Sequence, residues 1–503
     1  MTDSAFSSFR PRAPGAAGRA GAGEAVRADV AIVGFGYAGL ATLLHLVRVA
    51  ERCSVAVVAR DASGLGLAYS TREPGHLLNV AAERMGAVAG QPEHFAGWLR
   101  TPAAASAAAA LAVPLPGALD YAPRALYGSY LRSLLELAVR LARERQIRIS
   151  WLRADAEAIE PGGRGGWVIA TAPRAVEANA CVLAIGNEPR RVFGAFTHRD
   201  LHPGPWTPHG ELPADRTDPV VLIGSGLSAV DSIISLRSAG YDGTILVLSR
   251  TGRFPAAHRA DVSPVALDSA EVERIRTLAD VLAYFRAQDR AGRDWRAAID
   301  GLRPHTQQLW QRLSPADQRE AINRWSSLWN LGRHRMAAEV AERIDAERRS
   351  GALSVLTIQR VQPRVTVSGL ALDVEMPADA RRTTVRPAAV VDSAGLQLDC
   401  AESGRALLRN LIRGGICAPH PTGLGLAAAD LGVAENLYTL GSLLTGQLWE
   451  TIAVPELRDQ AARIARRLTH SPRRTSPTRR SVTEGAAAST RHEGGTRSLS
   501  PSS

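Results

Sequence analysis

Two segments of the chain, far apart from each other, repeat the same order of apolar residues and glycines. The first begins at Val30 and reads VAIVGFGYAGLATLLHL, so that an apolar run meets Gly34, Gly36 and Gly39 before a helical apolar pattern begins. The second begins at Pro219 and reads PVVLIGSGLSAVDSII, and each segment is followed by another short apolar run. Strand, glycine turn, helix and strand in this order form the βαβ unit that binds a dinucleotide. One such match is weak evidence in a chain with 45 glycines, whereas two complete ones are hard to attribute to chance.

Each glycine of the first segment has a distinct expected role. Gly34 makes the tight turn, Gly36 lets the backbone approach a pyrophosphate, and Gly39 lets the helix pack on the strand. The helix begins near Tyr37 and Ala38, where its positive end would face the phosphates. We therefore expect the first segment to be a cofactor site.

The residues that end the second strand of each unit favour different nucleotides. Asp61, slightly later than usual and preceded by Arg60, is the candidate for the ribose hydroxyls in the first unit. In the second unit the strand ends in Ser249 and Arg250, and a guanidinium there suits the 2′-phosphate of NADPH. The alternative for Arg250 is a solvated surface arginine. The cofactor-binding residues expected in the second unit are Gly224, Ser225, Gly226, Leu227, Ser228, Ser249 and Arg250.

Length and composition limit the possible classes of protein. A chain of 503 residues holds roughly two or three domains, and no apolar run is long enough to span a bilayer. The net charge of +11 comes from arginine alone, since the sequence contains no lysine, and no basic reading element for nucleic acid is present. The absence of lysine also excludes P-loop nucleotide hydrolysis and Schiff-base catalysis.

The four cysteines, Cys53, Cys181, Cys400 and Cys417, stand far apart with no C-x-x-C spacing. This pattern argues against a zinc site, an iron–sulfur cluster and a redox-active disulfide, and no metal is expected. Two dinucleotide-binding units in one chain are most simply paired as FAD in the first and NADPH in the second, with hydride passing between them. The expected fold class is α/β, with two Rossmann-like domains of the three-layer ββα type and a helical insertion.

Beyond the glycines, the sequence resembles the two-domain FAD/NAD(P)-binding oxidoreductases, relatives of the flavin-containing and N-hydroxylating monooxygenases. The resemblance runs from about Asp29 to Leu468. The segments that carry it are GLGLAYSTREPGHLLNVAAERMGAV, PEHFAGWL, YAPRALYGSYL, LSRTGRFPAAH, LRPHTQQLWQRL, LGRHRM and LYTLGSLLTGQLWETIAVPELRDQAARIA.

The resemblance implies a role for residues outside the two glycine loops. Gly66, Ala68 and Tyr69 would lie against the isoalloxazine end of FAD, and Asn79 and Val80 would continue that wall. For Tyr69 and Asn79 the alternative is packing within the loop. The strand that ends at Gly441 and the helix from Val454 would return to the FAD domain and close over the cofactor.

The resemblance also implies a domain order in which the NADPH part is inserted into the FAD part. The expected divisions are a disordered leader at 1–27, a discontinuous FAD-binding domain at 28–215 and 390–470, an NAD(P)H-binding domain at 216–389 with a helical insertion at about 263–349, and a disordered basic tail at 471–503.

The sequence departs from the family in two places. Half of the flavin-containing monooxygenase fingerprint is present, since Gly194 and His198 are correctly spaced while Val192 and His202 replace the aromatics. Ala394-Gly395 replaces the usual threonine-glycine pair, at a position that commonly touches cofactor. The first departure weakens the case for oxygenation specifically.

The helical insertion offers two sets of candidate residues. Trp295, Trp310, Trp325 and Trp329 would form core or, less often, a substrate box. The cluster of Arg333, His334 and Arg335 could meet a carboxylate-bearing substrate or form a solvated helix face.

The leading functional hypothesis is an FAD-dependent, NADPH-using monooxygenase that acts on a small molecule through a flavin C4a-hydroperoxide. An amino-acid amine is a candidate substrate for N-oxygenation. The alternatives are a flavin-dependent dehydrogenase or reductase and a non-catalytic flavin redox sensor. The expected partners are the small-molecule substrate and dioxygen, with no nucleic acid and no membrane, in the cytoplasm. The sequence designates no catalytic residue and no oligomeric state.

Overall fold

The computed structural model describes residues 24–172, 174–202, 218–377 and 381–470. The predicted basic tail at 471–503 and most of the predicted leader lie outside the described residues. The first strand already begins at Val26, so residues 26 and 27 belong to the sheet and not to the leader. Strands and helices alternate along the chain and the predicted α/β class is confirmed.

The first sheet has the order β15-β16-β6-β1-β2-β3, with the antiparallel strands β4 and β5 attached beside β6. The pairs that join β16, β6, β1, β2 and β3 are all parallel. Val30 to Val33 are buried on both faces, which is why this run is apolar without alternation. The strands are β1 (Val26–Val33), β2 (Ser54–Val58), β3 (Arg148–Leu152), β4 (Ala158–Pro161), β5 (Trp167–Ala170), β6 (Val176–Leu183), β15 (Gly432–Ala434) and β16 (Leu437–Thr439).

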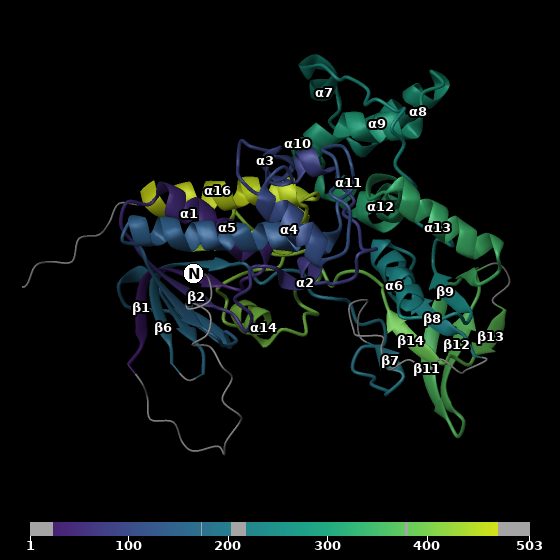
Figure 1. Cartoon of the computed structure of the whole chain (residues 1–503), viewed down its shortest axis with the longest axis horizontal. Helices are drawn as coiled ribbons and strands as arrows, with labels where there is room; N and C mark the ends of the chain where they lie inside the picture. Colours follow the sequence, from purple (N-terminus) through teal and green to yellow (C-terminus); the bar gives the residue numbers. More distant parts are fainter. Residues whose placement is uncertain (1–23, 173, 203–217, 378–380, 471–503) are drawn as a thin grey trace, which may run out of the picture. The chain divides into compact units, whose positions relative to one another are not determined.

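Helices cover both faces of this sheet. In Figure 1, α1 (Tyr37–Val49), α5 (Arg124–Glu144) and α16 (Val454–His470) lie side by side over one face. Val30 and Ile32 of β1 share a core with these helices. Ala31 and Val33 face the other side, where they share a core with Leu407, Leu408 and Leu411 of α14 (Ala406–Arg413). The strand β16 and the helix α16, from the end of the chain, thus complete a sheet and a core that begin at Val26.

The second sheet is parallel throughout and has the order β10-β9-β8-β14-β7. Its strands are β7 (Leu201–His202), β8 (Val220–Ile223), β9 (Ile245–Ser249), β10 (Leu353–Thr357) and β14 (Ala389–Asp392). One face packs on α6 (Leu227–Ser238) and α13 (Ala338–Arg349). The other packs on a three-stranded antiparallel sheet of β11 (Arg360–Thr366), β12 (Gly369–Glu375) and β13 (Arg382–Val385).

The second sheet extends beyond the boundaries that the sequence predicts for the NAD(P)H part. Residues 390–392 belong to β14, and residues 201–202 form β7, although both fall in the ranges assigned to the FAD part. β14 pairs with β8 because its apolar run matches a fully buried parallel strand.

A group of short helices follows the second glycine unit. These are α7 (Ser269–Arg274), α8 (Leu278–Arg290), α9 (Trp295–Leu302), η3 (Arg303–His305), α10 (Thr306–Arg312), α11 (Pro315–Glu320), the π-helical turn η4 (Ala321–Trp325) and α12 (Ser326–Arg333). The remaining short helices are α2 (Gly66–Tyr69), η1 (Ala82–Arg84), α3 (His94–Trp98), α4 (Pro102–Ala110), η2 (Gly163–Gly165), η5 (Gly441–Leu444) and α15 (Thr445–Leu448).

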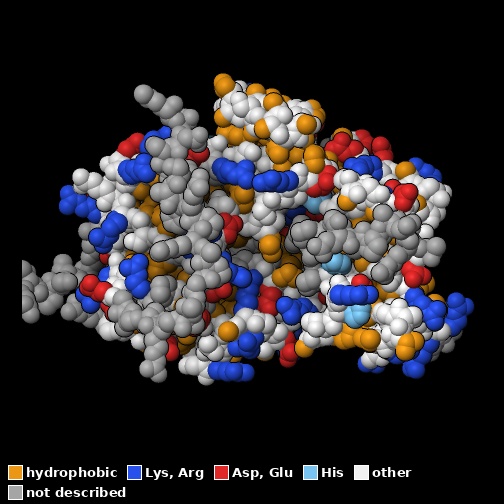
Figure 2. Space-filling model, turned by 60° about the horizontal axis from the view of Figure 1, so that its bottom comes forward, with side chains coloured by type: hydrophobic (Ala, Val, Ile, Leu, Met, Phe, Trp, Pro, Cys, Tyr) orange, Lys and Arg blue, Asp and Glu red, His pale blue; other side chains and the backbone are white. Residues whose placement is uncertain are grey.

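Arginine side chains are interspersed with acidic ones on the face drawn in Figure 2 and do not gather into one continuous patch there. Among the residues that the structure describes, no helix combines the length and apolar character needed to cross a bilayer.

Candidate functional site

The two glycine loops have the same geometry at the carboxyl ends of two parallel sheets. Gly34 follows β1 with φ +90°, and a Cβ atom there would lie 2.4 Å from the carbonyl oxygen of Ala184. Gly224 follows β8 with φ +101°, and its Cβ would lie 2.5 Å from the carbonyl oxygen of Ser393. Both the left-handed backbone and the close approach of a neighbouring strand end therefore require glycine at these positions.

Each loop leads into a helix whose first N–H groups have no acceptor in the described part of the chain. Gly36 is the N-cap of α1, and the first bonded amide is that of Leu40, which donates to Gly36 O at 3.0 Å. Gly226 is the N-cap of α6, and Ala229 donates to its carbonyl oxygen at 3.0 Å. Neither N-cap carries a side chain that could satisfy the remaining donors. Such a terminus is suited to bind a phosphate group.

The middle glycines differ in their surroundings. A Cβ on Gly36 would lie 3.2 Å from the Cα of Gly66, so the backbone at the start of α2 closely approaches the first loop. Gly226 is exposed, and no atom lies within 4 Å of a Cβ built on it. A Cβ atom built on Gly39 would lie 2.4 Å from the carbonyl oxygen of Gly34, which agrees with a role of this glycine in packing the helix against the turn.

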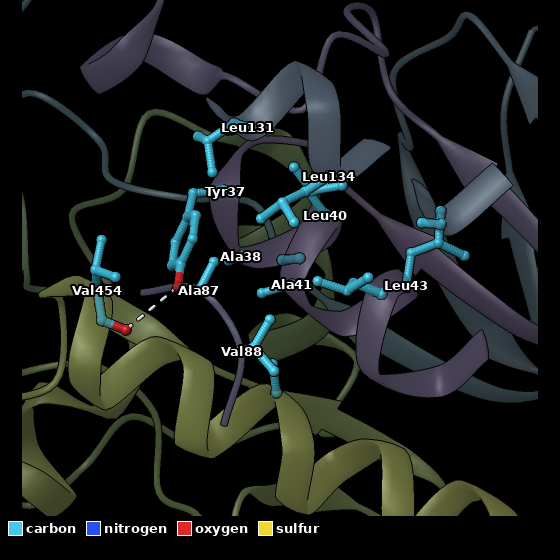
Figure 3. Packing of buried hydrophobic residues seen from close by; sticks show 14 of the residues in the cluster. Tyr37, Ala38, Leu40, Ala41, Leu43, Ala87, Val88, Leu131, Leu134 and Val454 are labelled. Atoms are coloured by element: carbon cyan, nitrogen blue, oxygen red, sulfur yellow. Dashed lines mark hydrogen bonds between the residues drawn. The ribbon is translucent and has the colours of Figure 1, made fainter. Parts of the chain in front are cut away.

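The side chains of Tyr37 and Ala38 point away from the phosphate-binding end of α1. Figure 3 shows both among buried apolar residues that include Val88 and Val454. The Tyr37 hydroxyl donates to the carbonyl oxygen of Val454 at 3.4 Å, and burial raises its pKa well above the usual value. Only the backbone of these two residues is available to a cofactor at the helix end.

Tyr69, the last residue of α2, takes part in an aromatic cluster. The ring centroid of Tyr69 lies 4.8 Å from that of Tyr127 and 6.1 Å from that of Tyr37, and burial raises the pKa of Tyr69 to about 12. Gly66, with φ +59°, starts the helix, and Ala68 is half-buried within it. The contacts of Tyr69 are thus those of a side chain packed against the rings of Tyr37 and Tyr127.

Asn79 and Val80 lie in a loop that contacts the segment after β9. The carbonyl oxygen of Asn79 is 3.1 Å from Nε2 of His258, and Val80 is buried in the first core. The His258 ring stacks on Tyr121 at 4.9 Å. Burial, reinforced by the charge of Arg335, lowers the pKa of His258 to about 4 although the Asn79 contact raises it.

Asp61 lies three positions beyond the end of β2 and is exposed. Its carboxylate accepts hydrogen bonds from the amide and hydroxyl of Ser63, at 2.9 and 2.6 Å, while Arg60 pairs with Asp155 at 3.0 Å. Asp61 therefore shapes its own loop, and its assignment to a ribose stays a prediction.

The end of β9 carries a hydroxyl network and two exposed arginines. Ser225 Oγ lies 2.7 Å from Ser249 Oγ and donates to the carbonyl oxygen of Arg253 at 2.7 Å. The guanidinium groups of Arg250 and Arg253 form no ion pair or hydrogen bond with the described residues. Ser228 and Leu227 are half-buried in the first turn of α6. This strand end thus places unpaired positive charge next to the second glycine loop.

Gly395 and Gly441 follow the strands β14 and β16 and have φ values of +93° and +79°. The carbonyl oxygen of Gly395 accepts from the amide of Arg190 at 2.9 Å. The Gly441 amide donates to Oε1 of the buried Gln460 at 2.9 Å. Gly441 is buried and Gly395 has no atom within 4 Å of an added Cβ, so of the two only Gly395 lies beside open space.

A cavity of about 550 Å³ lies among the helices α8 to α12. The four tryptophans that sequence analysis assigned either to core or to a substrate box, Trp295, Trp310, Trp325 and Trp329, all line it. Trp449 and Phe254 also line it, and the sequence analysis did not identify either. Trp449 stacks on Trp310 with ring centroids 4.6 Å apart.

The basic cluster is neither a solvated helix face nor available to a substrate carboxylate. Arg333 is 5% exposed and pairs with Glu450 at 3.4 Å, while Arg335 is 4% exposed and pairs with Asp300. Nε2 of His334 is 3.9 Å from Glu450. Burial alone raises the pKa of Glu450, but the charges of Arg333, His334 and Arg303 and a hydrogen bond from Trp329 outweigh it, and the pKa is lowered.

No disulfide joins the four cysteines. Burial raises the pKa of Cys400 to about 12 and that of Cys417 to about 11, and it raises the pKa of Cys181 further. Thiols with raised pKa values are poor nucleophiles at neutral pH. Within the described residues, no group of three or more His, Cys, Asp or Glu side chains is arranged to hold a metal ion.

A comparison with known protein families finds a match that includes the first glycine loop. Residues 31–188 match the FAD-NAD(P)-binding family, whereas a comparison with curated protein sequences finds no match. The match shows that this region is similar to FAD-NAD(P)-binding domains, and the prediction of FAD and NADPH as cofactors is confirmed.

Several solved structures have a similar fold at low sequence identity. Ornithine N-hydroxylase of Kutzneria sp. 744 is 16% identical with a TM-score of 0.56, over 88% of this chain and 99% of that chain. DfoA, the FAD-bound cadaverine monooxygenase of Erwinia amylovora, is 12% identical with a TM-score of 0.59, over 88% and 95%. Bacillithiol disulfide reductase of Bacillus cereus is 14% identical with a TM-score of 0.50, over 88% and 99%. The chain has the fold of flavin-dependent NAD(P)H oxidoreductases.

Proposed function

We propose that the protein is an FAD-dependent monooxygenase that uses NADPH and acts on a small molecule. The observation that carries the proposal is the pair of glycine loops, each of which presents unbonded helix amides at the carboxyl end of a parallel sheet. In open α/β sheets this is where dinucleotides bind. We assign FAD to the part built on the first sheet and NADPH to the part built on the second.

The residues present suit these two cofactors. Amides of Gly36, Tyr37 and Ala38 would hold the FAD pyrophosphate, and Gly66 allows the chain to pass close beside it. Amides of Gly226 and Leu227 would hold the NADPH pyrophosphate, with Arg250 at the 2′-phosphate. When bound, the flavin accepts a hydride from NADPH and activates dioxygen. In the overall reaction the substrate gains one oxygen atom, the other leaves as water, and NADPH supplies two electrons.

The cysteines favour oxygenation over the reduction of a disulfide by a protein dithiol. Cys181, Cys400 and Cys417 are buried, and their pKa values are raised. No C-x-x-C motif is present, and buried thiols with raised pKa values are poor nucleophiles for relaying electrons from a flavin. The fold similarity to ornithine and cadaverine monooxygenases supports the same choice.

Two measurements on the purified protein test the proposal. NADPH added without oxygen should bleach the flavin, and readmitted oxygen should restore its colour. Oxygen consumption should then be measured with catalase present and absent. Catalase converts the peroxide released by uncoupled turnover back to half of the oxygen consumed, whereas oxygen that is transferred to a substrate is not returned. Flavin that NADPH does not bleach would support a non-catalytic flavoprotein. Bleaching without any oxygen consumption, whatever the substrate, would support a dehydrogenase or reductase.

A further inference from the structure

The cavity among helices α8 to α12 draws its wall from both predicted nucleotide-binding parts. Phe254 follows β9, and its neighbour Arg253 is held to the second glycine loop because its carbonyl oxygen accepts a hydrogen bond from Ser225 at 2.7 Å. Trp449 follows the segment that begins at Gly441 on the first sheet. The rest of the wall comes from the helical insertion. A molecule in this cavity would therefore contact chain segments that continue directly into both cofactor sites.

Several polar atoms of the wall are already hydrogen-bonded, and the surface left for a ligand is mainly apolar, although the indole N–H of Trp325 is buried with no acceptor among the described residues. Trp310 donates its indole N–H to Gly446 O at 2.7 Å, and Trp329 donates to Glu450 Oε1 at 2.8 Å. The hydroxyls of Thr306 and Ser326 donate to carbonyl oxygens four residues earlier in the chain, those of Leu302 and Ile322, at 3.2 and 2.6 Å. Among the residues that the structure describes, no acidic or histidine side chain lines the cavity, and the one charged side chain on its wall is the exposed Arg253.

The wall is held in place before any ligand binds. Trp449 stacks on Trp310, and the Glu450 that accepts from Trp329 is itself paired with Arg333 in the interior. Trp325 ends the π-helical turn between α11 and α12, a distortion that often occurs at functional sites. Aromatic faces held rigidly in this way bind flat apolar molecules at little entropic cost.

We propose that this cavity binds an uncharged, largely aromatic small molecule, and that such molecules are the substrate class of the oxygenase proposed above. The substrate assignment rests on the proposed function, whereas the binding assignment does not. The ammonium group of an amino acid or a diamine would lose its water in this cavity, and the described lining residues offer it aromatic faces but no carboxylate. The volume of about 550 Å³ lies within the range of small-molecule sites, about 300–1,000 Å³.

Binding is tested by calorimetric titration of the flavin-containing protein without NADPH. The probes are naphthalene and indole, compared with L-ornithine. Leu328 lines the cavity at its edge and is 52% exposed, so Leu328→Glu should fold while placing a charge beside the ligand. Leu119→Glu is the matched control, since Leu119 is 71% exposed and does not line the cavity. We expect naphthalene to bind the wild type and Leu119→Glu equally and Leu328→Glu about tenfold more weakly.

The same preparation separates the two assignments. The binding assignment is overturned if naphthalene does not bind the wild type, if Leu328→Glu binds it unchanged, or if L-ornithine displaces it. Oxygen consumption with NADPH is then measured with indole, whose electron-rich ring carbon C3 can accept an oxygen atom. Stimulation by indole and not by L-ornithine supports the substrate class. Stimulation by L-ornithine alone overturns it while the proposed function stands. Naphthalene binding without oxygen consumption stimulated by indole supports the binding site and overturns the substrate class. The proposed function itself is contradicted only if NADPH fails to bleach the flavin or if bleaching is followed by no oxygen consumption.

Discussion

Trp329 donates its indole N–H to Glu450 Oε1 at 2.8 Å, and this hydrogen bond ties one wall of the cavity to a buried ion pair. Glu450 Oε2 lies 3.4 Å from Nη2 of Arg333, whose side chain is 5% exposed. The ion pair of Arg333 and Glu450 therefore stabilises the interior of the helical insertion, and the hydrogen bond to Glu450 fixes the position of the Trp329 ring.

Replacing Glu450 by Gln should destabilise the protein strongly. The amide still accepts the hydrogen bond from Trp329, but Arg333 is left as a buried charge without its partner, which costs about 3–5 kcal/mol. Urea unfolding measures the loss. Glu342→Gln is the control because Glu342 is exposed on α13. An equal stability of the two variants would show that water reaches Arg333 and replaces the carboxylate.

The lowered pKa of Glu450 also predicts loss of stability in acid. A carboxyl group whose pKa is lower in the folded than in the unfolded protein contributes stability at pH values above its unfolded-state pKa, near 4.3. This contribution is lost as the pH falls through the folded-state pKa. Below about pH 4.3 the wild type should lose stability more steeply than Glu450→Gln. Thermal unfolding at pH 5 and at lower pH compares the two, and parallel curves would contradict the prediction.

His258 should make stability depend on pH in a higher window. Its pKa is about 4 in the folded protein against about 6.5 when unfolded, so the unfolded state binds the proton more tightly. Stability is fully present above pH 6.5 and falls as the pH drops toward 4, by about 3 kcal/mol at most. His258→Gln should flatten this part of the curve in urea unfolding, and a slope equal to that of the wild type would contradict the prediction.

Gly36→Val should prevent FAD binding. A Cβ atom at this position would lie 3.2 Å from the Cα of Gly66, and the two methyl groups of valine would fill the space beside the unbonded amides of α1. We expect the flavin content of the purified protein to fall at least about tenfold, measured by absorbance and by chromatography of the heat-released chromophore, which should be FAD and not FMN. Gly163→Val is the control, since Gly163 is exposed with no atom within 4 Å of its Cβ. Equal flavin content in both variants would contradict the placement of the pyrophosphate.

Arg250→Ala should weaken the binding of NADPH and leave the binding of NADH unchanged. Loss of a charge-assisted hydrogen bond to the 2′-phosphate costs about 1.5–3 kcal/mol, or roughly ten- to a hundredfold in apparent affinity. Rates of flavin reduction by each coenzyme provide the measurement, with Arg290→Ala as a surface control. The same loss in Arg253→Ala but not in Arg250→Ala would move the contact to the neighbouring arginine. A wild type that prefers NADH would contradict both.

Local sequence predicted the parts of the fold that depend on local rules. The glycine loops lie where the strand, turn and helix order places them, because left-handed backbone and close strand approach leave no other residue type possible at Gly34 and Gly224. The return of the strand before Gly441 to the first sheet followed from a family resemblance. The boundary at 389 was wrong by three residues, since β14 is a short apolar run that could pair with either sheet.

The sequence could not show which distant side chains meet. The sequence left Arg333 either to a substrate carboxylate or to a solvated helix face, because its actual partner, Glu450, lies far along the chain. Trp449 joins the cavity wall only when the C-terminal segment packs against the insertion, and its stacking on Trp310 has no sequence signal. Likewise, Arg124 and His76 contact Asp231 of α6, at 3.3 and 2.9 Å, through tertiary packing alone.

The position of α16 has a consequence for how the chain folds as it leaves the ribosome. Every strand of the second sheet has been synthesised by residue 392, whereas the first sheet lacks β15 and β16 until residue 439. Until α16 follows, the apolar side of α1 that receives Ile464 and Ala465 stays uncovered, and so does the site where Tyr37 bonds to Val454. Because domains fold as units during synthesis, the part that begins first in the sequence is the last to be completed. A nascent chain halted before α16 would therefore have a complete second sheet and an incomplete core on the first sheet.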